Sequence, residues 1–130
     1  MARRKLGIWI IGAKGGVATT ATVGLIALKK GLVGNQGLVS TLPRFAHLDF
    51  AAWKDFVVGG HEIRTTTLYD EAMKLHEQSR ALDANLIARC RADLDKIDKQ
   101  IVPGTILNVG ATIEKFATPQ LRNRVETPRQ

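Results

Sequence analysis

The sequence predicts an α/β fold in which a partial, doubly wound parallel sheet carries flanking helices. Residues 6–11 form a continuous apolar run that stops at Gly12, which is typical of a strand buried on both faces of a parallel sheet. Residues 17–30 then change to a helical pattern, and Gly31 ends it. Strand, glycine turn and helix in this order are the opening of a βαβ unit.

The next predicted strand lies after a long irregular stretch. Residues 31–53 are rich in glycine, contain a proline and show no sustained period, so we expect mostly loop with at most a short strand near Leu38-Val39. Residues 55–60 repeat the design of the first strand, because a short apolar run ends at Gly59-Gly60.

In the second half of the chain, we predict a helical region followed by a third strand of the sheet. Apolar residues recur every three or four positions over 68–101, which indicates one long amphipathic helix or two in series, with Thr67 as the N-terminal cap. Pro103-Gly104 breaks the pattern, and 105–110 are predicted to form a third strand that again ends in glycine. The polar tail, 119–130, is expected to fray.

Composition excludes several classes of function. The chain has 130 residues, a net charge of +7 and a single cysteine, so it is about one domain long and has no internal disulfide. Its basic residues gather at the two ends without a stripe or interleaved aromatics, which argues against a nucleic-acid surface. No apolar run is long enough for a membrane span, and the three histidines lack metal-ligand spacing. We expect a cytoplasmic protein without a metal site.

The loop "GAKGGVATT", residues 12–20, has the chemistry of a phosphate-binding turn, and two interpretations compete. An ATP-binding P-loop needs a lysine directly before its Ser/Thr, but Ala18 and Thr19 stand where glycine and lysine belong. Lys14 imitates only the additional lysine of variant P-loops. The ATPase therefore stays as an alternative, beside a tight turn that binds nothing.

A dinucleotide-binding turn fits the loop better. Such a turn needs glycines where the chain bends and where the backbone approaches the diphosphate, and a small residue where helix meets strand. Gly12, Gly15 and Ala18, with Gly16 beside them, give a G-x-x-G-x-x-A pattern. The N–H groups of residues 15–18 would then point at the diphosphate from the positive end of the helix.

A dinucleotide site also needs an acid at the end of the next strand, where it holds the adenosine ribose. Glu62 is the first candidate, and its distance along the chain requires that 31–53 form an insertion. A carboxylate at this position favours NAD over NADP, because it repels a 2′-phosphate.

Two stretches resemble the nucleotide-binding domain of myo-inositol-1-phosphate synthase, also called inositol-3-phosphate synthase. "GIWIIGAKGGVATT" with "VGLIALKKGL" is similar to the strand, loop and helix of prokaryotic-type members, and "DFVVGGHEIRTTTLYDEAM" resembles the "DFV-x-GWDI" segment. The resemblance runs from about residue 6 to 117. One departure is His61-Glu62, which stands where many members have Trp-Asp.

The resemblance implies a Rossmann-like domain of an NAD-dependent isomerase in inositol and phospholipid biosynthesis. In that family, bound NAD oxidises C5 of glucose 6-phosphate, enolisation and intramolecular aldol closure follow, and the cofactor returns the hydride. The residues that the resemblance assigns to the pyrophosphate are Gly12, Ala13, Gly15, Gly16, Val17 and Ala18. It assigns the adenosine ribose to Glu62.

The resemblance also implies that catalysis requires a second domain. Family lysines that bind the sugar phosphate lie downstream of the residues present here, and no catalytic group can be assigned within 1–130. We therefore expect a partial NAD-binding domain over 1–118, a polar tail over 119–130, and action on glucose 6-phosphate only where a catalytic domain is supplied. A stand-alone NAD-binding or interaction module is the alternative. A truncated sheet exposes an unpaired edge, which predicts self-association.

Overall fold

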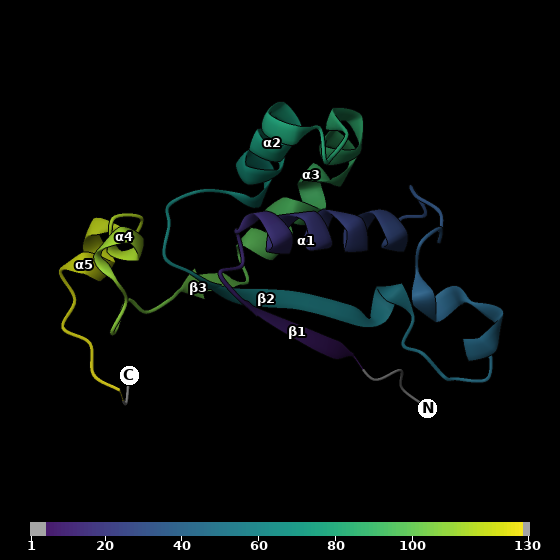
Figure 1. Ribbon diagram of the computed structural model, residues 1–130, viewed down its shortest axis with the longest axis horizontal. Helices are drawn as coiled ribbons and strands as arrows, with labels where there is room; N and C mark the ends of the chain where they lie inside the picture. The colour runs from purple at the N-terminus through teal and green to yellow at the C-terminus, as the bar shows by residue number, and fades with distance from the viewer. Residues whose placement is uncertain (1–4, 129–130) are drawn as a thin grey trace.

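The three strands lie side by side and run in the same direction. In the computed structural model, which describes residues 5–128, β1 (Leu6–Ile11), β2 (Phe56–Glu62) and β3 (Ile101–Pro103) form one parallel sheet in the order β1-β2-β3 (Figure 1). Crossovers through helix connect them, as a parallel sheet requires. The predicted Rossmann-like α/β fold is therefore confirmed, and β1 and β3 are the two edges.

The backbones of β1 and β2 approach each other closely at a glycine. Ile10 stands opposite Gly60 in the register, and a Cβ added at Gly60 would lie 2.1 Å from the Ile10 carbonyl oxygen and 2.8 Å from the Ala13 Cβ. No side chain fits in that space, so glycine at this point lets the loop after β1 lie directly against β2.

Three helices cover one face of the sheet: α1 (Gly16–Lys29), α2 (Leu68–Ser79) and α3 (Ala84–Asp98) (Figure 1). The predicted helical region is thus two helices in series, separated where Arg80 adopts a left-handed φ of 57°. Thr67 caps α2 as predicted, because its hydroxyl accepts the Asp70 N–H at 3.0 Å. The buried core between these helices consists of Val23, Ile26, Ala27, Leu68, Ala72, Leu82, Ile87, Cys90 and Leu94.

The opposite face of the sheet is bare among the described residues. All three long helices lie on one side in Figure 1, and the other side exposes Trp9 and Ile11 of β1, Val57 of β2 and Val102 of β3. Trp9 is 57% exposed and Ile11 is 77% exposed. A doubly wound sheet buries both faces, whereas among residues 5–128 the long helices cover only one face.

Two predicted strand boundaries are wrong. Strand β2 continues to Glu62, two residues past the predicted end, because Gly60 and His61 still pair with β3. The third strand occupies 101–103 instead of 105–110. Helix α3 ends so close to the sheet that the chain pairs at once, while Thr105 and Ile106 instead hydrogen-bond to Glu126 of the tail.

Apart from α1, α2 and α3, the described segments outside the sheet contain only short helices and 3-10 turns. The insertion 31–53 holds no strand; Val39–Thr41 (η1) and Pro43–Phe45 (η2) are 3-10 turns, and Trp53–Asp55 (η3) leads into β2. After β3 come α4 (Ala111–Glu114) and α5 (Pro119–Arg122), beyond the carboxyl end of the sheet (Figure 1). Within 5–128, no helix has the length and apolar character that crossing a bilayer demands.

The polar tail does not fray between 119 and 128. Thr118 caps α5 by accepting the Leu121 N–H at 3.3 Å, and the Leu121 side chain is buried. Further on, the Glu126 carboxylate accepts from the Thr105 hydroxyl at 2.6 Å and from the Ile106 N–H at 2.9 Å. Contacts between residues this far apart leave no periodic pattern in a sequence, so sequence patterns do not predict that the tail packs against the domain. Residues 129–130 lie outside the described part.

Candidate dinucleotide-binding site

The glycine loop turns sharply at the end of β1 and uses its first N–H groups for its own structure. Gly12 adopts a φ of 76°, a conformation that side chains disfavour. The N–H groups of Gly12 and Ala13 both donate to the His61 carbonyl oxygen, at 2.9 and 3.0 Å, and the Gly15 N–H donates to the Gly12 carbonyl at 2.9 Å. These three N–H groups therefore form hydrogen bonds within the turn and to the end of β2.

The next N–H groups, at the beginning of α1, are available. Gly15 is the N-cap residue and offers no side-chain oxygen, and the first helical bond runs from the Thr19 N–H to the Gly15 carbonyl at 2.8 Å. The N–H groups of Gly16, Val17 and Ala18 precede that bond. No acidic residue stands in the first turn, so the positive helix end is uncompensated by a local carboxylate.

The loop also has the shape for a close approach. A Cβ at Gly15 would lie 3.2 Å from the Gly12 carbonyl oxygen, and Gly16 and Val17 are both exposed. Backbone N–H groups at a helix start with glycine at the N-cap and at the first helical position are suited to a diphosphate. Gly16, Val17 and Ala18 stay predicted contacts of the diphosphate.

Glu62 lies beside this loop, at the carboxyl end of β2. The residue is 8% exposed, and its carboxylate binds the loop directly: the Lys14 N–H donates to Oε2 at 2.9 Å. The N–H groups of Ile63 and Arg64 donate to Oε1 at 2.9 and 3.2 Å. The acid and the glycine loop, far apart in sequence, thus form one structural unit.

Arg64 completes the surroundings of Glu62 and was not identified from the sequence. Its Nε donates to Oε1 at 3.2 Å and its Nη2 to Oε2 at 3.1 Å, while Nη1 lies 3.6 Å from Glu71. Burial raises the pKa of Glu62, but hydrogen bonds from Arg64, Ile63 and Lys14 outweigh it and hold that pKa below its ordinary value. The carboxylate is therefore ionised at neutral pH. The one sequence signal that could have pointed to Arg64 is its position two residues after the acid.

Lys14 points away from the loop mouth. Its ammonium donates to the Thr66 carbonyl at 2.6 Å and pairs with Asp98 at 3.1 Å, and its side chain is 13% exposed. Asp98 in turn accepts the Leu68 N–H at the start of α2, at 3.1 Å. Lys14 is thus neither a solvated loop lysine nor a diphosphate ligand in this arrangement.

The same geometry argues against an ATP-binding P-loop. That loop needs a lysine at the phosphates and a free Ser/Thr hydroxyl on magnesium. Lys14 is engaged by Asp98, Thr19 is fully buried, and the Thr20 hydroxyl donates to the Gly16 carbonyl at 2.8 Å.

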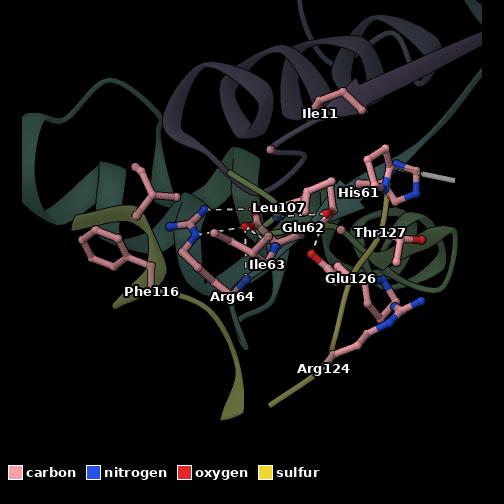
Figure 2. A pocket seen from close by; sticks show the side chains of 16 residues that line it. Ile11, His61, Glu62, Ile63, Arg64, Leu107, Phe116, Arg124, Glu126 and Thr127 are labelled. Atoms are coloured by element: carbon pink, nitrogen blue, oxygen red, sulfur yellow. Dashed lines mark hydrogen bonds and ion pairs between the residues drawn. The ribbon is translucent and has the colours of Figure 1, made fainter. Parts of the chain in front are cut away.

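A pocket of about 720 Å³ opens at the carboxyl ends of the three strands. Ligands of open parallel sheets bind at this edge. Figure 2 shows Glu62 and Arg64 on one wall and Arg124, Glu126 and Thr127 of the tail on another. Gly12 and Glu62 are the two predicted site residues that line it; residues 13 and 15–18 lie outside its lining. His61 lines it too, and the Trp9 indole N–H donates to its Nδ1 at 3.0 Å.

Four polar residues that come after β3 are exposed and do not line the pocket: Asn108, Thr112, Glu114 and Lys115. Residues 5–128 also bring together no cluster of three or more His, Cys, Asp or Glu side chains that would hold a metal ion.

Comparison with known families agrees with this geometry. The family model of the NAD-binding domain of myo-inositol-1-phosphate synthase matches residues 6–109. That range contains the glycine loop, all three strands and Glu62. No curated protein matches the chain.

Proposed function

The chain belongs to the myo-inositol-1-phosphate synthase family, and on that premise we propose that it is the NAD-binding portion of an isomerase. The isomerase converts glucose 6-phosphate to myo-inositol phosphate by internal oxidation, aldol cyclisation and reduction. The observation that supports cofactor binding most directly is the 2.9 Å hydrogen bond from the Lys14 N–H to Glu62. It holds a diphosphate-binding helix start beside a ribose-binding acid.

Each part of the site has a task in this proposal. The N–H groups of Gly16, Val17 and Ala18 hold the diphosphate, and the ribose hydroxyls donate to Glu62. Gly12, Ala13 and Gly15 shape the turn through their own hydrogen bonds. Bound NAD supplies a reversible hydride acceptor, which is what an isomerisation without net oxidation needs.

We also propose that the NAD-binding domain ends at residue 118 and that the enzyme is cytoplasmic. Residues 1–118 form the partial NAD-binding domain and 119–130 the tail. Glucose 6-phosphate is a substrate in this proposal only where a catalytic domain is supplied. The second candidate is a stand-alone NAD-binding or interaction module without catalysis.

Calorimetric titration of the 130-residue chain with NAD, NADP and ATP tests cofactor binding. We expect saturable NAD binding that Gly15→Asp abolishes. Val17→Asp should abolish it too without harming the fold, since Val17 is 88% exposed and an acid in the first turn stabilises a helix. Val33→Asp is the matched control, because Val33 is exposed in the distant insertion. ATP binding without NAD binding by a chain folded by circular dichroism would refute the proposal.

An assay for inositol phosphate separates the two candidates. The isolated chain, mixed with NAD and glucose 6-phosphate, should form no product in either case. Addition of a catalytic domain of this family restores turnover if the chain is part of an isomerase. A chain that binds NAD but never supports turnover is the stand-alone module.

A further inference from the structure

The Glu62 carboxylate has no acceptor capacity left. It receives five hydrogen bonds, three from the N–H groups of Lys14, Ile63 and Arg64 and two from the Arg64 guanidinium. A carboxylate offers about four lone-pair sites. A ribose hydroxyl therefore reaches Glu62 only after one of these donors leaves.

The guanidinium is the donor that can leave. The three N–H groups belong to the backbone of the loop and of the strand end, whereas the Arg64 side chain is 30% exposed. Arg64 also has a second carboxylate within reach, because its Nη1 lies 3.6 Å from Glu71. Rotation of this one side chain releases Glu62 and leaves the guanidinium paired with Glu71 alone.

Arg64 also lines the pocket beside Glu62. A 2′-phosphate on the adenosine ribose would stand next to the acid, which repels it, and next to the guanidinium, which binds phosphate in two-point fashion. The Arg64 side chain thus opposes binding of the NAD ribose to Glu62 and favours binding of the 2′-phosphate of NADP.

From these contacts we propose that Arg64 sets the choice between NAD and NADP. This inference rests on the proposed NAD site. Arg64 competes with the ribose of NAD for Glu62 and supplies the cation that a 2′-phosphate requires. It therefore reduces the ratio by which the site prefers NAD over NADP. A residue that only stabilises the fold would change the affinity for both dinucleotides in the same direction.

Titration of wild type and Arg64→Met with NAD and with NADP tests the proposal. We expect Arg64→Met to bind NAD more tightly and NADP more weakly, so that the ratio of the two dissociation constants shifts by about tenfold or more, or about 1.4 kcal/mol. Lys74→Met is the matched control. Lys74→Met also removes a cation beside Glu71, because the Lys74 ammonium lies 2.7 Å from the Glu71 carboxylate. Lys74 does not touch Glu62. An unchanged ratio, or parallel weakening of both ligands, overturns the proposal.

Two further variants keep the test decisive if Arg64→Met does not fold. Arg64→Lys retains the charge but not the two-point grip, so NAD binding should tighten while NADP binding persists. Glu71→Gln removes the second carboxylate and should weaken NAD binding, because the guanidinium stays on Glu62. If both leave the ratio at its wild-type value, Arg64 does not select the cofactor. A folded wild-type chain that binds neither dinucleotide refutes the NAD site itself, and this inference with it.

Discussion

The backbone N–H of Lys14 lies 2.9 Å from a carboxylate oxygen of Glu62, although the two residues are 48 positions apart. The contact joins the glycine loop after β1 to the end of β2. It also fixes the start of α1 relative to the acid, because the loop leads directly into that helix. Glu62 is therefore a structural partner of the loop as well as a candidate ribose ligand.

This double role predicts that Glu62→Gln lowers stability in a pH-dependent way. The folded-state pKa of Glu62 lies below its ordinary value of 4.5, so its contribution to the free energy of unfolding is full above that pH. The contribution is lost as pH falls toward the folded pKa, because the unfolded chain takes up the proton first. Thermal melts between pH 7 and pH 3 should show a shallower acid decline for Glu62→Gln than for wild type.

Glu77→Gln provides the comparison, since Glu77 is exposed on α2. It should retain the wild-type pH profile. If Glu62→Gln and Glu77→Gln have the same profile as wild type, the Glu62 carboxylate does not stabilise the loop.

Gly60→Ala should be strongly destabilising. The added Cβ would meet the Ile10 carbonyl oxygen at 2.1 Å, which is backbone and cannot rotate away. We expect a loss of about 3 kcal/mol or more in urea unfolding, at the upper end of overpacking costs. Gly24→Ala, in open space within α1, should instead raise stability by about 0.5–1 kcal/mol. Equal effects of the two substitutions would contradict the close approach of β1 and β2.

Local patterns predicted the elements that local chemistry determines. The apolar run of β1, the glycine turn and the Thr67 cap all lie where the sequence placed them, because neighbouring residues specify each of them. The third strand was misplaced because 101–103 is too short to show a period, whereas the apolar residues near 105–110 imitate a strand. Only the pairing of Gly104 N–H with the Glu62 carbonyl, at 2.9 Å, fixes where that strand ends.

The candidate site was predictable in kind but not in detail. Motif spacing pointed to the loop and to Glu62. It could not reveal that the N–H groups of Gly12, Ala13 and Gly15 form hydrogen bonds within the turn and to β2. Nor could it reveal Arg64, whose role depends on how the chain bends after β2. Contacts between distant segments decide such details, and no pattern in a single sequence records them.

Lys14→Met separates a structural lysine from a phosphate-binding one. The ammonium ties the loop to Asp98 and Thr66 with little exposure, so its loss should destabilise the fold by about 1–3 kcal/mol. NAD affinity should change by less than about threefold, or about 0.7 kcal/mol. Lys96→Met, at an exposed pair 3.8 Å from Asp93, should cost almost nothing. A large loss of NAD affinity at unchanged stability would instead make Lys14 a diphosphate ligand.

We expect the edge of β1 to pair with a second copy of the chain, for a specific physical reason. The strand is an outer one, and its sequence LGIWII contains neither a charge nor a proline to block pairing. The bare face beside it exposes Trp9 and Ile11. A second copy related by a two-fold axis would pair its own β1 antiparallel to this edge and extend the sheet, burying apolar surface from both chains.

Trp9→Lys should therefore shift the chain toward the monomer. Trp9 is 57% exposed on the bare face, and a lysine there both removes apolar area and places like charges opposite each other in a symmetric pair. In sedimentation velocity, the wild-type mass should rise with concentration, while Trp9→Lys stays at 14.2 kDa. Val33→Lys, an exposed valine away from the sheet, should behave as wild type. A wild-type chain that remains monomeric at all concentrations would show that the β1 edge does not pair with a second copy.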